Sequence, residues 1–283
     1  MKVLTRIADT RAAARALKAS GRKLGLVPTM GALHEGHLSL VRLAKKYCDS
    51  VAVSIFVNPK QFGPNEDFAK YPRSFERDHQ VLEMEGVDLI FAPTVEEMYP
   101  QGSTTFVNVE GISERLDGAS RPGHFRGVTT VVSKLFHIVE PDRAFFGQKD
   151  AAQVAIVKRM VRDLDLPVEI VVGPIVREPD GLAMSSRNAY LDSNQRKQAL
   201  VLSRALKGVE GFIREGEVDT NRLVNAAKRI FAEERDVRVD YIAVVDPDTL
   251  DPVNDVNTRA LVAVAAYVGS TRLIDNLVVE ARK

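Results

Sequence analysis

The chain has 283 residues, of which 45% are hydrophobic and 27% charged, a balance typical of a globular protein with a sizeable core and room for two domains. Its formal net charge is +1 and it has no run of five basic residues, which argues against a nucleic-acid partner. Cys48 is the only cysteine, which excludes an intrachain disulfide and a cysteine-based zinc site. The apolar runs are shorter than the ~20 residues that span a membrane, and the N-terminus has no signal-peptide pattern, so we expect a cytoplasmic protein without a membrane partner.

Strand-like and helix-like segments alternate over the first half of the chain. Runs of Val, Ile and Phe predict buried strands at 24–29, 50–58, 87–93, 143–147 and 168–176. Helical spacing of apolar residues predicts helices at 7–18, 38–47, 74–85, 128–138 and 151–164. This order predicts right-handed βαβ units and an α/β fold with a Rossmann-like, doubly wound parallel sheet.

The character of the chain changes near residue 175. The segment 177–181 (REPDG) is rich in turn-forming residues and follows Pro174. Helical patterns at 193–214 and 220–234 then precede strand-like runs at 237–245, 260–268 and 277–279. Helices followed by strands indicate a smaller C-terminal α+β domain. We therefore expect a first domain over residues 1–175 and a second domain over residues 176–283.

The segment 28–37 (PTMGALHEGH) joins a predicted strand to a predicted helix. Backbone N–H groups at a helix start carry partial positive charge, and Gly31 and Gly36 allow a phosphate to approach the backbone closely. His34 and His37 are three residues apart, so both rings can face one anion and donate to the transition state of a reaction at phosphorus. The spacing is not that of a zinc motif, and the alternative interpretation is a pair of structural helix-start residues.

Two further segments carry groups that suit a nucleotide. The segment 147–150 follows a predicted strand, so Lys149 lies at the sheet edge where ligands bind, although a lone lysine is often only a solvated charge. The segment 184–187 (MSSR) combines two hydroxyls with a guanidinium, which together can hold a polyphosphate. A cap or turn is the alternative for 184–187, but its place just after the interdomain connection would let it close over a nucleotide.

Polar side chains near the other predicted strand ends are candidates for a second substrate. Asn58 and Gln61 follow the second predicted strand, and Gln153 lies at the start of a later helix. Glutamine offers a donor and an acceptor, so it can bind a hydroxyl and a carboxylate together, although a glutamine is more often a surface residue. The basic segment 121–126, which begins at Arg121, is either a lid beside the substrate or a hydrogen-bonded turn.

Magnesium would need few protein ligands beside a nucleotide, because it keeps waters and binds mostly through phosphates. Asp78 and Asp150 are the carboxylates that we consider for that side of the site. The chain lacks a G-x-G-x-x-G fingerprint, a P-loop and a G-x-S-x-G elbow. These absences disfavour a dehydrogenase, a P-loop NTPase and a serine hydrolase.

Five motifs, taken in order, resemble those of a known family. The segment 33–37 (LHEGH) resembles the H-x-G-H signature of the nucleotidyltransferase superfamily, and 184–187 resembles its second motif. The pantoate–β-alanine ligases resemble this chain over nearly its whole length, through the segments 28–37 (PTMGALHEGH), 56–62 (FVNPKQF), 121–128 (RPGHFRGV), 146–150 (FGQKD) and 184–188 (MSSRN).

The resemblance implies a reaction in two steps. The carboxylate of pantoate attacks the α-phosphate of ATP, which gives pantoyl adenylate and pyrophosphate, and β-alanine then displaces AMP to give pantothenate. The resemblance also implies Mg²⁺ as cofactor with ATP, a cytoplasmic location and a homodimer. The first domain would bind nucleotide and pantoate, and the second domain would close over the ATP site.

The resemblance also implies roles for individual residues. His34, His37 and Lys149 would be catalytic, with His37 as the proton donor. The implied ATP-binding residues are Met30, Gly31, Ala32, Leu33, His34, Glu35, Gly36, His37, Gly147, Gln148, Lys149, Asp150, Val176, Met184, Ser185, Ser186 and Arg187. Gln61 would bind pantoate and β-alanine, Gln153 would bind pantoate, and Asn58 and Arg121 are further substrate-binding candidates. The protein ligand of the metal is unknown, with Asp78 as a candidate.

Three other functions are alternatives. One is another adenylyl- or cytidylyltransferase of the same superfamily, which would transfer the nucleotide to a phosphate acceptor. A synthetase that acts on tRNA would need a basic surface, which the near-neutral charge disfavours. The third is a nucleotide-binding regulatory module without turnover, which would have no need for His37, Lys149 and Arg187.

Overall fold

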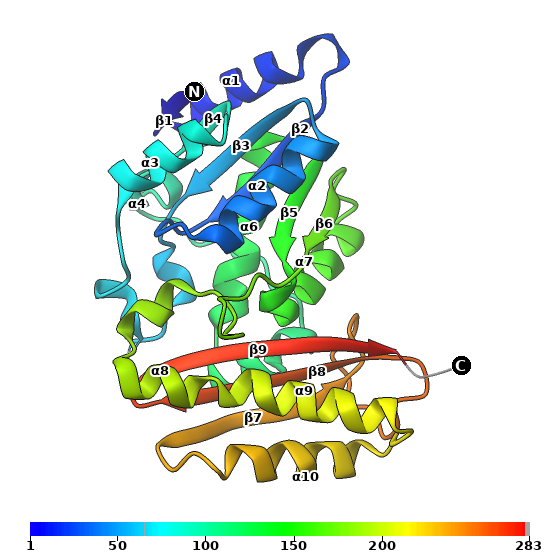
Figure 1. Ribbon diagram of the computed structural model, residues 1–283. Helices are drawn as coiled ribbons and strands as arrows, with labels where there is room; N and C mark the ends of the chain where they lie inside the picture. The colour runs from blue at the N-terminus through cyan, green and yellow to red at the C-terminus, as the bar shows by residue number, and fades with distance from the viewer. Residues whose placement is uncertain (65, 281–283) are drawn as a thin grey trace.

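A six-stranded parallel sheet forms the first half of the protein in the computed structural model, which describes residues 1–64 and 66–280 (Figure 1). Its strands are β1 (Lys2–Leu4), β2 (Leu24–Thr29), β3 (Ser50–Ile55), β4 (Leu89–Phe91), β5 (Arg143–Gly147) and β6 (Glu169–Gly173). They lie in the order β1-β4-β3-β2-β5-β6, and every pair of neighbours is parallel. The order reverses between β2 and β5, which is where a doubly wound sheet opens a crevice for ligands. The predicted α/β fold is confirmed.

Helices cover both faces of this sheet. One face packs against α1 (Ile7–Lys18), α6 (His124–Val139) and α7 (Ala151–Asp163), and the other against α2 (Glu35–Tyr47) and α3 (Phe75–Met84). Successive strand residues point to opposite faces, so Leu26 packs into the first layer while its neighbour Val27 packs into the second. Both residues are fully buried, which explains why these strands are apolar on both faces.

The second half of the chain is built on a three-stranded antiparallel sheet. Its strands are β7 (Val237–Val245), β8 (Arg259–Val268) and β9 (Thr271–Glu280), and β8 lies between the other two. The helices of this half are α8 (Ser193–Ala199), α9 (Val201–Arg214) and α10 (Thr220–Phe231). The expected smaller α+β unit is therefore present, and the expected domain boundary falls just after β6.

The antiparallel sheet is covered on both faces. Val262 and Val264 pack on one face against α9 and α10. Leu261 and Ala263 point the other way and belong to the same core as α6 and α7. Figure 1 shows β9, in red, lying between the parallel sheet above and α9 below. The two sheets thus share one continuous apolar core.

Several elements differ from the sequence-based prediction: α6 begins at His124 and not at residue 128, and β3 ends at Ile55 and not at residue 58. The chain forms a short edge strand, β1, that is only three residues long and was not predicted. The helical pattern over 193–214 is interrupted at Leu200, where α8 ends and α9 begins. The strand predicted at 277–279 begins at Thr271, because its first half contains polar residues that break the apolar pattern.

Short helical turns complete the fold. They are α4 (Val95–Met98), α5 (Asp117–Ser120), and the 3₁₀ turns η1 (Ala19–Gly21), η2 (Pro59–Gln61), η3 (Asp67–Ala69), η4 (Ile112–Glu114), η5 (Gln148–Asp150) and η6 (Ser186–Tyr190). Within the described part of the chain, none of the helices combines the length and the apolar character needed to cross a membrane.

Candidate active site

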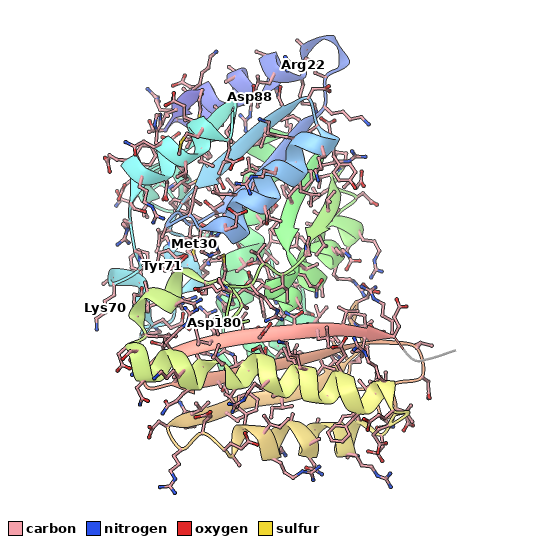
Figure 2. All side chains as sticks on the ribbon, viewed as in Figure 1. Arg22, Met30, Lys70, Tyr71, Asp88 and Asp180 are labelled. Atoms are coloured by element: carbon pink, nitrogen blue, oxygen red, sulfur yellow. The ribbon has the colours of Figure 1, made fainter. Side chains whose placement is uncertain are left out.

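A cleft lies at the carboxyl ends of β2 and β5, between the parallel sheet and the segment that leads into the second domain. Figure 2 places Met30 and Tyr71 at this junction. The predicted site residues that line the cleft are Met30, His34, His37, Gln61, Arg121, Lys149, Asp150, Gln153, Met184, Ser185, Ser186 and Arg187. Segments that are far apart in the sequence therefore meet at one sheet edge, as the topology requires.

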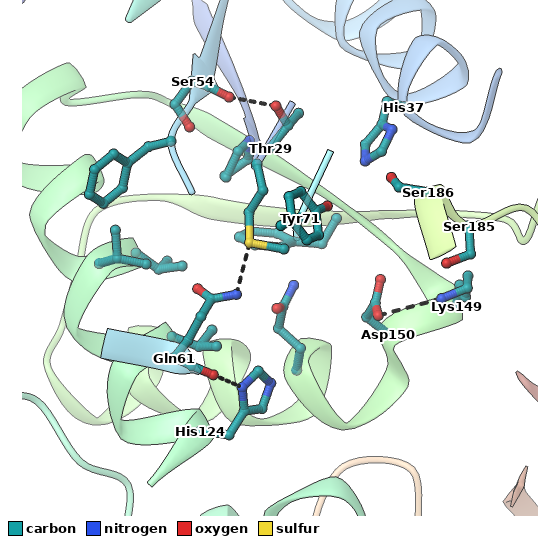
Figure 3. Close-up of a pocket in the computed structure, with 18 of the residues that line it drawn as sticks. Thr29, His37, Ser54, Gln61, Tyr71, His124, Lys149, Asp150, Ser185 and Ser186 are labelled. Carbon is teal, nitrogen blue, oxygen red and sulfur yellow. Dashed lines mark hydrogen bonds and ion pairs between the residues drawn. The ribbon is translucent and has the colours of Figure 1, made fainter. Parts of the chain in front are cut away.

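The cleft has two chemically different sides. In Figure 3, His37, Ser185, Ser186 and Lys149 gather on one side, and Gln61 and His124 lie on the other. The first group offers cationic and neutral donors that suit phosphate oxygens. The second group offers amide and ring nitrogens that suit a smaller polar substrate.

His34 and His37 form a compact pair at the start of α2. His34 caps the helix, because its Nδ1 accepts the backbone N–H of Gly36 at 3.1 Å. The Nδ1 of His37 accepts the backbone N–H of His34 at 3.3 Å, and the ring centroids are 4.1 Å apart. Since each Nδ1 is an acceptor, the proton of each neutral ring lies on Nε2. Both rings therefore keep an N–H donor even when they carry no charge.

Burial keeps these two rings neutral in the ligand-free protein. It lowers the pKa of His34 to about 4, with a further contribution from the nearby Lys149 ammonium. It lowers the pKa of His37 to about 3, and the charges of His34 and Lys149 act in the same direction. A bound phosphate would oppose the field of Lys149 and raise both pKa values.

The loop between β2 and α2 is held by a buried carboxylate. Gly31 and Ala32 both have positive φ, 83° and 50°, which is unusual for a residue with a side chain. Asp78, from α3, accepts the backbone N–H of Ala32 at 2.8 Å through Oδ2 and that of Leu33 at 2.9 Å through Oδ1. Asp78 is only 1% exposed, so its carboxylate oxygens bind the backbone of the loop and not solvent. This geometry argues for a positioning role and against the magnesium-side role considered from the sequence.

Asn58 lies behind Gln61 rather than in the cleft. Its Nδ2 donates to Gln61 Oε1 at 3.1 Å and to the carbonyl of Gly127 at 3.1 Å, and its Oδ1 accepts the hydroxyl of Tyr99 at 2.9 Å. Gln61 Nε2 also lies 3.1 Å from the sulfur of Met30. Asn58 is almost completely buried, so it orients the Gln61 amide.

Arg121 forms polar contacts with Glu66 and with His124, which in turn contacts the backbone carbonyl of Gln61. It forms two hydrogen bonds with the Glu66 carboxylate, of 2.8 and 2.6 Å, and lies 3.0 Å from Nε2 of His124. The other ring nitrogen of His124 lies 2.8 Å from the carbonyl of Gln61. Burial and, to a smaller extent, the charge of Arg121 lower the pKa of His124 to about 4. The uncharged ring therefore connects Arg121 to the backbone carbonyl of Gln61. The basic segment 121–126 is thus a hydrogen-bonded wall of the cleft.

The segment 184–187 reaches across the cleft to the first domain. The hydroxyl of Ser186 donates to the carbonyl of Ala32 at 3.3 Å. Arg187 donates two hydrogen bonds of 2.9 Å to Asp67, which lies in η3. Sequence reasoning did not identify Asp67, because the charge partner of an arginine 120 positions away carries no local signal.

Some predicted residues face away from the cleft. Glu35 pairs with Arg42 on the exposed side of α2. The side chain of Gln148 points to Asn276, and the carbonyl of Val176 accepts the backbone N–H of Met184 at 3.0 Å. Gly31, Ala32 and Leu33 belong to the loop between β2 and α2, Gly36 lies in the first turn of α2, and Gly147 is the last residue of β5.

Other lining residues were not predicted. Tyr71 and Ser54 line the cleft, and so do the apolar residues Val128, Val131, Val132 and Leu135 of α6. The α6 residues have the helical spacing of ordinary core residues, so sequence alone does not separate them from the core. Among the described residues there is no cluster of three or more His, Cys, Asp or Glu side chains that could hold a metal ion.

A family model described as pantoate-beta-alanine ligase matches residues 2–278. The chain belongs to the pantoate–β-alanine ligase family. Curated relatives agree: pantothenate synthetase from Koribacter versatilis is 60% identical over 281 residues, covering 99% of this chain and 97% of the relative. The enzyme of the same name from Acidobacterium capsulatum is 64% identical over 282 residues, covering 96% and 94%.

Solved structures of this ligase family have the same fold. Pantothenate synthetase from Thermus thermophilus superposes with a TM-score of 0.93 at 48% identity, covering 98% of this chain and 99% of that one. A pantoate–β-alanine ligase from Francisella tularensis, crystallised with β-γ ATP and β-alanine, gives 0.76 at 35% identity, covering 98% and 97%. The chain is accordingly an ATP-using ligase.

Proposed function

We propose that this ligase joins pantoate to β-alanine through a pantoyl-adenylate intermediate, with consumption of ATP and release of AMP and pyrophosphate. The observation that carries the proposal is the two-sided cleft, which sets His34, His37 and Lys149 opposite Gln61 and Gln153. The Francisella tularensis relative, crystallised with β-γ ATP and β-alanine, supports the same pair of ligand classes.

In the first step, an oxygen of the pantoate carboxylate bonds to the α-phosphorus of ATP, and the bond from that phosphorus to pyrophosphate breaks. Negative charge grows on the α-phosphate oxygens, where the Nε2–H groups of His34 and His37 and the ammonium of Lys149 donate. Ser185, Ser186 and Arg187 hold the leaving pyrophosphate. Arg187 uses Nε and one terminal nitrogen for Asp67, so its other terminal nitrogen can donate to phosphate oxygens while the Asp67 pair is kept.

In the second step, the amine of β-alanine attacks the acyl carbon of pantoyl adenylate, and the bond to AMP breaks. The free amine keeps one hydrogen in the amide and gives up the other to solvent, and AMP leaves with the electron pair of the broken carbon–oxygen bond. Gln61 and Gln153 hold the pantoyl group, and Gln61 also contacts β-alanine. The enzyme forms no covalent bond to either substrate, because adenylation has already activated the carboxyl.

Mg²⁺ is proposed to enter with ATP. Of the described residues that line the cleft, Asp150 is the one carboxylate. This donor set fits an ion held mainly by phosphates and water, with Asp150 as the nearby protein oxygen. The ion would neutralise phosphate charge. A homodimer and a cytoplasmic location are further expectations, which light scattering and cell fractionation would test.

Release of AMP from ATP and Mg²⁺ tests the function directly. We expect AMP release to require both pantoate and β-alanine, and mass spectrometry to detect pantothenate. Dependence on a different acceptor would favour the related nucleotidyltransferases. ATP binding without turnover would favour a regulatory nucleotide-binding protein.

A further inference from the structure

Two adjacent polar residues of β9 are buried where the two domains meet. Asp275 is 2% exposed and Asn276 is 3% exposed, although polar side chains of this kind are mostly found at the surface. They lie in β9, an edge strand of the antiparallel sheet that is located between the parallel sheet and α9 (Figure 1). The proposed reaction gives neither residue a role.

Asn276 holds the turn that carries Lys149. Its Nδ2 donates to the carbonyl of Gln148 at 3.0 Å and to the carbonyl of Lys149 at 2.9 Å. Its Oδ1 accepts the side-chain amide of Gln148 at 3.1 Å. The amide nitrogen and the oxygen of the Asn276 side chain therefore both bind the consecutive residues Gln148 and Lys149. This contact fixes the backbone from which the Lys149 side chain extends into the cleft.

Asp275 holds the turn that leads to the segment 184–187. Its two oxygens accept hydrogen bonds of 2.7 and 3.0 Å from Arg177 in a bidentate pair. Arg177 also donates to the carbonyl of Gly181 at 3.1 Å, and the neighbouring Val176 carbonyl accepts the backbone N–H of Met184 at 3.0 Å. Bidentate pairs fix orientation as well as distance, so Asp275 sets the course of the turn that begins at Arg177 and returns to Met184.

We propose that Asp275 and Asn276 are positioning residues for the two segments that hold the phosphates. Asn276 sets the turn that carries Lys149, and Asp275, through Arg177, sets the turn that leads to Met184 and the segment 184–187. The inference rests on the proposed function, because it uses the phosphate roles given there to Lys149 and to Ser185, Ser186 and Arg187.

A purely structural role would have different consequences. Contacts that only join the two domains would change stability and affect every ligand alike. Positioning predicts a separation: a change at Asn276 or at Arg177 weakens binding of the phosphates and spares binding of the nucleoside. Comparing ATP with adenosine, which lacks phosphates, distinguishes this outcome from a general loss.

The first experiment replaces Asn276 by leucine, which has a similar size and no hydrogen-bonding groups. Calorimetric titration should show about tenfold weaker binding of ATP to N276L and adenosine binding within about twofold of the unchanged enzyme. The KM for pantoate should stay within about twofold. The matched control is Asn225→Leu on the exposed face of α10, which should leave all three values unchanged. Equal losses for ATP and adenosine, or no loss for either, would overturn the assignment of Asn276.

The second experiment tests Arg177→Lys, which keeps the charge but loses the bidentate geometry. We expect R177K to weaken ATP binding by about three- to tenfold and to leave adenosine binding within about twofold. This change at a half-buried residue also tests the positioning of the phosphate segments if N276L fails to fold. Unchanged ATP binding in R177K, or an equal loss for ATP and adenosine, would refute the role of Asp275.

A double-mutant cycle separates failure of this inference from failure of the proposed function. If Asn276 acts through Lys149, the K149M/N276L variant binds ATP no more weakly than K149M alone. Additive losses of ATP affinity would mean that Asn276 does not act through Lys149, which would overturn the inference. ATP binding that is unaffected by K149M would instead remove the phosphate role of Lys149 and with it the proposed function of that residue.

Discussion

His34 and His37 are buried histidines that remain hydrogen-bond donors without a charge. Their Nδ1 atoms are occupied by backbone N–H groups, so the donors that remain point away from the helix start. Neutral rings cost less to bury than imidazolium ions, and they become charged more easily once phosphate arrives. We expect nucleotide binding to be accompanied by uptake of protons at this pair.

Under the proposed function, replacement of His37 by alanine would remove one donor to the reacting phosphate. We expect the rate of pantoyl-adenylate formation to fall by about 10²–10³-fold, because such donors act most strongly in the transition state. Single-turnover measurement of pyrophosphate release provides the rate. A decrease of less than about tenfold would remove His37 from this role.

The same histidines make the protein sensitive to acid. The pKa of His37 is about 3 in the folded protein and near 6.5 when exposed, so between these pH values the unfolded chain binds more protons. The free energy of unfolding should therefore fall as the pH falls from about 6.5 toward 4. Thermal unfolding at a series of pH values should show a smaller loss for His37→Gln than for the unchanged protein. An identical pH dependence in both would contradict the buried neutral ring.

At the level of single elements, the loop from β2 to α2 depends on α3. Asp78 accepts two of its backbone N–H groups, and Asn in its place would turn an N–H group toward these donors. We expect Asp78→Asn to lower the free energy of unfolding by about 1–3 kcal/mol and to raise the KM for ATP. Denaturant unfolding and steady-state kinetics measure the two effects.

The same variant separates two roles for Asp78. If Asp78 bound Mg²⁺, a higher Mg²⁺ concentration would restore the activity of D78N. If Asp78 positions the loop, added Mg²⁺ has no such effect, and this is the outcome that we expect.

The sequence predicts best those elements in which each face keeps the same surroundings, apolar or solvent, along its whole length. β2 and β5 are buried on both faces and α1 is amphipathic, so their patterns predict their bounds. β1 is too short for a pattern to be detected. The first half of β9 was missed because Arg272, Asp275 and Asn276 are polar, and the structure shows that these residues contact groups outside their own sheet.

The same distinction between local patterns and distant contacts applies to the residues of the candidate site. Local motifs around His37, Lys149 and Arg187 predict that these residues lie near one another, and all three line the same cleft; the parallel topology explains why His37 and Lys149 meet. Partners that act at a distance, such as Asp67 for Arg187 and Asn276 for the turn at Lys149, depend on tertiary structure. Asp78 was noticed for its charge, but its two backbone partners could be found only in the folded chain.

At the scale of the whole molecule, the shared core should make the two halves unfold together. Leu261 and Ala263 of the antiparallel sheet pack into the core of the parallel sheet, and large apolar contacts of this kind oppose independent domain behaviour. Any closure over ATP would then come mainly from segments at the cleft mouth, such as those joined by Arg187 and Asp67.

Leu261→Ala tests this coupling. A cavity at a buried leucine costs about 2–5 kcal/mol, and we expect the loss to lower the midpoint of a single transition for the whole chain. Calorimetry should give one peak, with far-ultraviolet circular dichroism following the same curve. Two separated transitions, of which only one shifts, would mean that the halves are independent.

The contact between Asn276 and Lys149 also has a consequence for synthesis on the ribosome. These residues are 127 positions apart, so at about 5–20 residues per second the turn at Lys149 emerges on the order of ten seconds before its partner. During that interval the nascent chain carries the loops of an ATP site without the strand that orders them. The turn at Lys149 therefore gains these hydrogen bonds only after the antiparallel sheet has been made and docked.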